Sequence, residues 1–275
     1  MKTYLTSFFL FLILMFQADK SLAQTHELGV TAGGMGFVGD VGATKGFQSI
    51  QNWKPTYGLF YRYNVDHFIA FRGGFNLGKI LADDVNSSDS YKELRGLHVM
   101  SDIWEASALA EYNFYIPARR KEVGFHTPYL FAGLSVFGFN PQAKYLDKLY
   151  DLQELGTEGQ TLNGGEKYNL TQLAIPFGIG YKLNLQNNFR FSVELNMRKT
   201  FTDYLDDVSG TYVDKFQLQQ ASGPEAVYFS DPNNQGELGK NRGNANNTDW
   251  FYSLGFSLSY VIKTKALKCP NPSLE

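Results

Sequence analysis

Cysteine is nearly absent from this sequence. The 275-residue chain has a single cysteine, Cys269, close to its C-terminus. One cysteine cannot form an internal disulfide, so the fold is not held together by a disulfide framework. A structural zinc site built from several cysteines is excluded for the same reason. The fold class must therefore be read from the patterning of the other residues.

Long apolar runs and a surplus of charge are also missing. Beyond the N-terminus, no segment reaches the ~18–20 apolar residues that a membrane-spanning helix needs. The formal net charge is −2, so we expect no nucleic-acid partner. The chain is rich in aromatic residues, at 16 %, and has 27 glycines, which together favour an all-β protein. Without spanning helices, such a chain crosses a membrane only as a closed barrel, which pairs every backbone polar group.

The N-terminus has the pattern of a signal peptide. Lys2 is a basic start, the run from Tyr4 to Phe16 is apolar but too short to span a bilayer, and Ala23 ends a segment of small residues. We expect cleavage after Ala23, which makes residues 1–23 the signal peptide. The alternative is an uncleaved anchor or a core helix.

Alternation with a period of two dominates the rest of the chain. In the first half of 189–214, apolar residues from Phe189 to Met197 alternate with polar ones, as in a β-strand with one apolar and one polar face. Similar patterns recur, so we predict eight strands. They cover residues 27–35, 55–64, 67–77, 103–114, 128–139, 170–184, the first half of 189–214, and 250–262.

The predicted connections are short after the second, fourth and sixth strands and long after the others. Outer-membrane barrels show this asymmetry, with short periplasmic turns and long outer loops. The apolar faces carry almost no charge, whereas the exterior of a soluble barrel, the alternative fold, is charge-rich. We therefore predict an all-β, eight-stranded antiparallel transmembrane β-barrel over 24–262, in the Gram-negative outer membrane and in contact with its lipids. Residues 263–275 form a periplasmic C-terminal tail.

Eight charged residues fall on the predicted inner face of this barrel. Buried charges require partners, and both signs are present, so we expect them to form a paired network in the lumen. The residues are Arg62, Arg72, Glu105, Glu111, Lys182, Arg190, Glu194 and Arg198.

The predicted periplasmic rim is basic. The cations are Arg119, Arg120 and Lys121 in a turn, and Lys263, Lys265 and Lys268 in the tail. Contact with anionic lipid headgroups accounts for such a rim. The other interpretation is a docking surface for a periplasmic or lipoprotein partner. Cys269 lies in the same tail and is either a free thiol or half of an intermolecular disulfide.

Catalytic and metal sites find little support in the sequence. The four histidines, His26, His67, His98 and His126, fall at strand starts, turns or loops, and only His98 has aspartates in range for a catalytic pair, Asp83 or Asp102. The acidic group Asp203, Asp206 and Asp207 follows the seventh strand and offers oxygen ligands for a cation. Its spacing does not match an EF-hand, so we expect a solvated loop, or a patch that bridges to lipopolysaccharide through ions. We predict no cofactor and no enzyme activity.

Several segments carry a resemblance to a known family. They are RYN at 62–64, HTPYLFAGLSVFGFNPQAKY at 126–145, LGTEGQ at 155–160, IPFGIGYKL at 175–183, RKTFTDYLDDVSGTYVD at 198–214, RGN at 242–244, and Cys269-Pro270. In these the chain resembles a family of small outer-membrane barrels widespread in Bacteroidota, most without an assigned function. The family-motif loop of this resemblance contains Thr202, Asp203, Asp206 and Asp207.

The family includes the barrel component of the type IX secretion system, which associates with the periplasmic ring of that machine. The resemblance thus implies a non-enzymatic outer-membrane barrel that anchors or docks a periplasmic partner, with a role in type IX protein secretion. The alternatives are a small-barrel enzyme that hydrolyses lipid or peptide, and a barrel for surface adhesion or binding.

Overall fold

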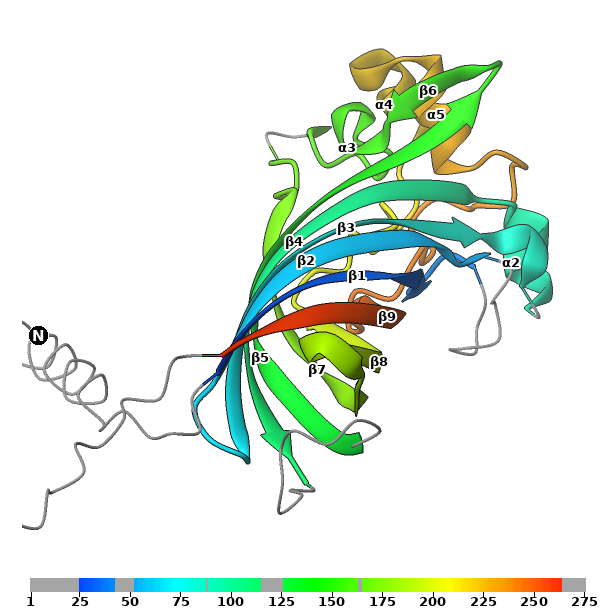
Figure 1. Cartoon of the computed structure of the whole chain (residues 1–275). Coiled ribbons are helices and arrows are strands. Elements are labelled where there is room, and N and C mark those ends of the chain that lie inside the picture. The colour runs from blue at the N-terminus through cyan, green and yellow to red at the C-terminus, as the bar shows by residue number, and fades with distance from the viewer. Residues whose placement is uncertain (1–24, 43–51, 88, 115–125, 163–164, 264–275) are drawn as a thin grey trace, which may run out of the picture.

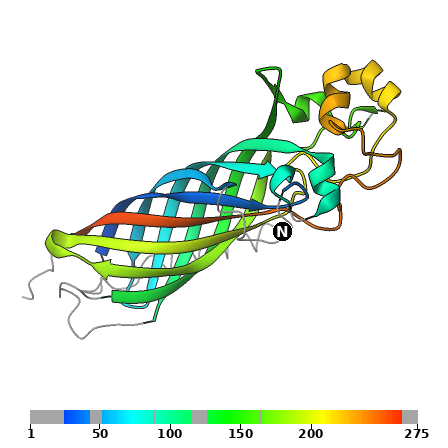
Figure 2. The same cartoon turned by 90° about the vertical axis from the view of Figure 1, so that its right-hand side faces the viewer.

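A computed structural model describes residues 25–42, 52–87, 89–114, 126–162 and 165–263. Eight of its strands form a closed antiparallel barrel, in which each strand pairs with its neighbours and β1 pairs with β9 (Figures 1 and 2). They are β1 (Thr25–Val38), β2 (Lys54–Asn64), β3 (Ile69–Asp83), β4 (His98–Asn113), β5 (His126–Tyr145), β7 (Thr171–Asn184), β8 (Phe189–Thr200) and β9 (Trp250–Lys263). The predicted eight-stranded barrel is confirmed.

The strands differ from the predicted ones mainly in length. β5 was predicted to end at residue 139, but it runs on to Tyr145 and turns back into a ninth strand, β6 (Lys148–Asp151). β6 pairs only with the end of β5 and lies outside the barrel wall. Residues 139–145 still alternate between apolar and polar types, but Asn140 and Pro141 are residues typical of turns, which is why a loop is predicted there.

The lengths of the connections distinguish the two ends of the barrel, a short-turn end and a long-loop end. At the short-turn end, residues 65–68 join β2 to β3 and residues 185–188 join β7 to β8, and β4 ends and β5 begins at the same end. Asn187 and Asn188 both have positive φ, 57° and 65°, which asparagine tolerates, and they make the predicted tight turn. At the long-loop end are the described parts of the connections 39–53, 84–97, 146–170 and 201–249.

The long connections contain short helices that the alternation did not predict. They are η3 (Asp84–Asn86), α2 (Ser90–Arg95), α3 (Leu152–Leu155), α4 (Lys215–Ser222) and α5 (Pro224–Ser230), while η5 (Gln186–Asn188) is part of a short turn. Side-chain caps begin several of them, because Asp83, Asp89 and Asp214 accept hydrogen bonds from backbone N–H groups of the first turn. The helices are too short to show a hydrophobic period in the sequence.

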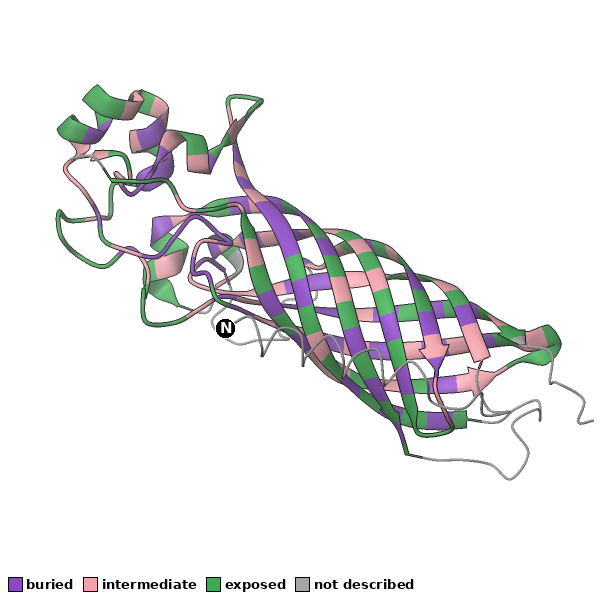
Figure 3. Ribbon diagram, turned by 90° about the vertical axis from the view of Figure 1, so that its left-hand side faces the viewer, coloured by how far each residue is buried: buried purple, intermediate pink, exposed green. Residues whose placement is uncertain are grey.

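Buried and exposed residues alternate along the barrel strands, so the wall has an inner and an outer face (Figure 3). Large apolar side chains point outward with little cover, including Leu134 at 70 %, Tyr57 at 63 % and Leu59 at 62 % exposed. The eight charged residues predicted for the lumen point inward and are buried, whereas charged residues near the long-loop end, such as Lys79 and Asp102, remain exposed. Tyr63, Tyr112, Tyr181 and Tyr260 stand on the outer face near the short-turn end, and Trp250 near the long-loop end. An apolar belt bordered by aromatic side chains therefore surrounds the barrel.

Gly33 shows why the barrel wall needs glycine at one point. A Cβ built there would lie 2.1 Å from the carbonyl oxygen of Leu254 on the paired strand β9. The two strands therefore approach closely at this position, which a side chain would prevent. Within the part of the chain that the structure describes, no helix has the length and apolar character to cross a membrane.

Candidate functional site

The barrel interior near the short-turn end is filled by a lumen network of ion pairs. Glu111 of β4 is its centre, because it receives Arg62 at 2.9 Å, Arg72 at 3.0 Å and Lys182 at 2.6 Å. Glu27 of β1 binds Arg62 at 2.8 Å and is also paired with Arg190. These strands are not all neighbours, so the network joins opposite walls of the barrel.

Glu194 extends the same network across the lumen. Its carboxylate is paired with Arg72 and accepts a hydrogen bond of 2.5 Å from the hydroxyl of Tyr129. The Tyr129 ring in turn lies 4.0 Å from the ammonium of Lys182, a cation–π contact. Further along the axis, Arg198 forms a separate pair with Glu105 at 3.0 Å and donates to Ser253 at 2.6 Å.

An apolar plug lies beyond the Arg198–Glu105 pair, toward the long-loop end. It is a cluster of buried side chains from six barrel strands and the loop after β8: Met35, Ile80, Ile103, Phe137, Phe139, Ala174, Leu205 and Phe251. Between the lumen network and the Arg198–Glu105 pair is a polar cavity of about 40 Å³, lined in part by Asn76 and Asn196. Such a volume holds roughly one or two water molecules. The described interior is therefore closed by paired charge in one half and by apolar side chains in the other.

All eight residues predicted for the lumen lie inside the barrel, and each contacts a group of opposite charge. Sequence reasoning missed Glu27, which is fully buried and holds two arginines. It also missed Tyr129, an aromatic residue on the inner face. Glu27 is the second inward position of β1, after Thr25, and the remaining inward residues of this strand are mostly glycine and threonine. One charged residue near the start of a strand does not by itself show whether its side chain points into the barrel or outward.

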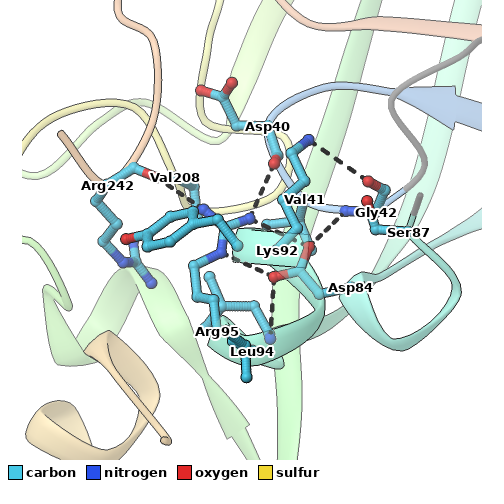
Figure 4. Close-up of polar contacts among 12 residues, drawn as sticks. Asp40, Val41, Gly42, Asp84, Ser87, Lys92, Leu94, Arg95, Val208 and Arg242 are labelled. Atoms are coloured by element: carbon cyan, nitrogen blue, oxygen red, sulfur yellow. Dashed lines mark hydrogen bonds and ion pairs between the residues drawn. The ribbon is translucent and has the colours of Figure 1, made fainter. Parts of the chain in front are cut away.

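The loop cap is the second candidate site. We use this name for the long connections at the long-loop end, which pack together around Val41, Leu97, Val208 and Phe229. Arg95 of α2 is buried in it and binds Asp84 at 2.8 Å, and its guanidinium also donates to the carbonyl oxygens of Asp40 and Arg242 (Figure 4). One side chain thus ties three separate loops together.

The family-motif loop runs through the centre of the loop cap. Asp206 accepts hydrogen bonds from the backbone N–H of Val41 at 2.7 Å and of Val208 at 3.1 Å. Asp207 has a positive φ of 64° and accepts hydrogen bonds from Thr157 and, at 2.7 Å, from Tyr168. Its own carbonyl accepts a 2.6 Å bond from Arg242.

Three of the segments that carry the resemblance meet at this point. Glu158, from LGTEGQ, accepts from the backbone N–H groups of Ser209 and Gly210, each at 2.9 Å. Arg242, from RGN, completes the contact by an ion pair with Glu158 at 3.1 Å. The segments at 155–160, 198–214 and 242–244 are thus parts of one folded unit.

The expectation of a solvated acidic loop is wrong. Asp206 is 1 % and Asp207 0 % exposed, and Thr202 and Asp203 are also buried. Oxygens of Thr202, Asp206 and Asp207 accept hydrogen bonds from backbone and side-chain donors, so these residues hold loops in place. Burial raises the pKa of Asp203 to about 7 and that of Asp207 to about 6. Burial also raises the pKa of Asp206 and of Asp249. The carboxyl of Asp40 adds to the shift of Asp206, and the carboxyls of Asp206 and Asp203 add to that of Asp249.

Of the predicted docking residues, the structure describes Lys263, which lies at the opposite end from the loop cap. Lys263 ends β9 at the short-turn end. Arg119, Arg120, Lys121, Lys265, Lys268 and Cys269 lie outside the described residues, as do the signal peptide and its cleavage site.

The histidines are spread over both ends of the barrel. His26 and His126 contact Tyr61 and Tyr181 on the outer face, each at 2.5 Å. His98 does lie beside Asp83, at 3.3 Å, on the surface of the long-loop end. No group of three or more His, Cys, Asp or Glu residues suited to a metal ion occurs in the described ranges.

Comparisons with known proteins give a family without an assigned role. The family described as "Domain of unknown function (DUF6089)" matches residues 6–222. The chain belongs to this family. The match contains the family-motif loop and seven of the eight barrel strands. No curated protein matches the chain.

Solved structures of outer-membrane proteins resemble the chain weakly. Neisserial surface protein A is 10 % identical, with a TM-score of 0.42 over 87 % of this chain and 97 % of that one. The N-terminal β-barrel domain of OprF from Pseudomonas aeruginosa is 14 % identical, with a TM-score of 0.36 over 85 % and 97 %. Ail of Yersinia pestis, solved with the heparin analogue sucrose octasulfate, is 10 % identical, with a TM-score of 0.38 over 87 % and 97 %.

Removal of one lumen carboxylate tests the network. Replacing Glu194 with Ala leaves Arg72 and the hydroxyl of Tyr129 without their shared acceptor, so the barrel should lose about 3–5 kcal/mol of unfolding free energy. The measurement is a denaturant titration in micelles. Ser135→Ala is the matched control, because the Ser135 hydroxyl is buried in the same lumen and has no hydrogen-bond partner among the described residues. Equal midpoints for the two variants would contradict the network.

The loop cap should become less stable as the pH rises from 4 to 7. The folded pKa values of Asp203 and Asp207, about 7 and about 6, exceed the ordinary value of about 3.9 for an unfolded aspartate. At pH values between the unfolded and the folded pKa, the folded cap binds more protons than the unfolded chain. The contribution of these two carboxyls to the stability of the cap is therefore greatest below about pH 4 and is lost as the pH rises through about 6–7. Hydrogen exchange of residues 201–249 at pH 5 and pH 8, corrected for the intrinsic pH dependence, measures this.

Two variants separate the buried carboxyls from ordinary surface charge. Asp203→Asn should flatten the pH dependence of protection in the loop cap. Glu237→Gln, in the same connection but paired with Lys240 on the surface, should leave it unchanged. Protection that rises between pH 5 and pH 8 in the unmodified protein would contradict the assignment.

Proposed function

We propose that this protein is an outer-membrane barrel, exported by a signal peptide cleaved after Ala23, that anchors a periplasmic partner and neither catalyses a reaction nor conducts solutes. The observation that carries the proposal is the combination of a closed interior with an apolar exterior. Paired charges fill one half of the lumen and the apolar plug fills the other. The outward leucine and tyrosine side chains match a lipid environment.

The orientation follows from the connections. Barrels of this class place short turns in the periplasm and long loops outside the cell. The short-turn end, together with the tail at 263–275, therefore faces the periplasm. Its cations, among them Lys263 and those in the segments outside the described residues, supply the docking surface of the proposal.

Type IX secretion is the process that we assign to this anchor. The support is the resemblance of segments 155–160, 198–214 and 242–244, which also form one folded unit in the loop cap. The partner in this proposal is a periplasmic protein or lipoprotein that binds the short-turn end. A second candidate is a surface-binding barrel, favoured by the ordered loop cap with exposed Phe216 and Leu238.

Membrane location and lack of conductance form the first test. The mature protein should fractionate with the outer membrane and migrate differently on a gel before and after boiling, because closed barrels resist detergent until heated. In planar bilayers it should give no stable conductance steps, since the plug and the ion pairs fill the lumen. Recovery in the soluble periplasm, or reproducible steps with the purified protein, would refute the proposal.

Docking through the tail is tested by Cys269. An intermolecular disulfide should appear on a non-reducing gel of native membranes as a band heavier than the monomer. The band should disappear when reductant is added and should be missing in Cys269→Ser. A pull-down without reductant should recover the partner, and one with reductant should not. A monomer band alone, with Cys269 freely labelled by a maleimide, would exclude the disulfide.

A further inference from the structure

The turn between β5 and β6 has an unexpected residue at its tip. Leu146 and Asp147 form a two-residue connection in which both have positive φ, 48° and 62°. Turns of this type favour Asn-Gly or Asp-Gly, because a Cβ is strained in this region. Aspartate tolerates it, but a leucine here is a genuine backbone outlier. Such strain persists where the surroundings or a function require it.

Leu146 gains nothing from packing within its own chain. Its side chain is 82 % exposed, more than any other large hydrophobic side chain in the described residues, and Leu149 beside it is 47 % exposed. The base of this hairpin is well packed, since Tyr145 contacts Tyr228 at 4.0 Å between ring centroids and Tyr150 contacts Phe229 at 5.4 Å. A rigid base thus presents a strained, bare leucine to the exterior.

The charges and the direction of the hairpin indicate what it meets. Lys144 and Lys148 flank the tip, and Lys148 is exposed and lies over the Tyr150 ring. Asp147 is paired with Lys144 at 2.8 Å, so the tip keeps a positive balance. In Figures 2 and 3 the hairpin leaves the barrel to the side and does not continue along its axis. In the proposed orientation, the hairpin therefore runs to the side of the barrel, along the bilayer surface.

We propose that the β5–β6 hairpin is a lipid-contacting finger, which inserts Leu146 and Leu149 into the bilayer surface beside the barrel and places Lys144 and Lys148 near lipid phosphates. Apolar side chains at an interface enter the headgroup–acyl boundary by roughly 5–10 Å, and lysine ammonium groups reach back to the phosphates. The inference rests on the proposed membrane location. It gives the strained leucine a role, because the energy of inserting Leu146 offsets the strain of its backbone.

Single-tryptophan proteins in nanodiscs test the finger. Trp53, Trp104 and Trp250 are replaced by Phe, and one tryptophan is then placed at 146, at 238, or kept at 104. The bilayer is phosphatidylcholine with phosphatidylglycerol, with or without bromine on the acyl chains. Emission from L146W should fall by about half in the brominated discs, because the side chain reaches the acyl boundary. L238W, at another exposed leucine of the loop cap, should not change.

The native Trp104 separates this proposal from the membrane location. Trp104 lies on the outer face of β4 and is 39 % exposed, so bromine should quench it in any lipid-embedded barrel. Quenching of Trp104 without quenching of L146W would overturn the finger and favour a protein partner for the tip. If bromine quenches neither Trp104 nor the tryptophan of L146W, the membrane location itself would be overturned.

A second variant separates insertion from folding of the turn. Asparagine accepts positive φ, so Leu146→Asn keeps the turn and should leave the melting temperature unchanged or higher. A tryptophan at position 149 should be quenched in the parent protein and lose that quenching when Leu146 is Asn. Equal quenching in both backgrounds would show that Leu146 does not hold the finger in the bilayer.

Discussion

The pairing of charge inside a closed barrel is the constraint on which the rest of the structure depends. A carboxylate or guanidinium removed from water is costly unless an opposite charge and hydrogen bonds compensate it. Glu111, at the centre of the lumen network, is bound by cations from β2, β3 and β7. No two adjacent strands supply such a set. Only closure of the sheet brings these side chains together, so closure and ion pairing stabilise each other.

The layers along the barrel axis follow from this arrangement. Charged groups occupy the half near the short-turn end, and the apolar plug occupies the other half, where Phe137 and Phe251 meet at 5.3 Å. A polar chain segment or a hydrated ion that entered from one end would meet the wrong environment in the other. The interior therefore acts as a support for the wall, and interactions with other molecules are left to the two ends and to the outer face.

The loop cap uses carboxyl groups in a different way. Asp206 and Asp207 mainly accept hydrogen bonds from backbone and hydroxyl donors. Glu158 accepts hydrogen bonds from two backbone N–H groups and forms an ion pair with Arg242. Carboxyl oxygens suit this task because each can accept several hydrogen bonds. Backbone groups in long loops would otherwise be buried without partners, so the acidic motif is best understood as the internal bracing of a folded domain at one end of the barrel.

The sequence by itself determined the number of barrel strands, their antiparallel order and the inward placement of the eight predicted lumen charges. These properties depend on a period of two and on the separation of lipid-like from polar surroundings, both of which are local. The inward placement of Arg62, Glu111 and Glu194 could be read in this way. Their partners could not, because the stagger of the strands around the barrel decides which inward residues share a level. Only the tertiary structure decided that Glu27 joins them, that Asp206 and Asp207 are buried, and that β5 continues into the finger. The physical reason is the same in each case: these features depend on contacts between segments far apart in the chain, and local patterning carries no record of such contacts.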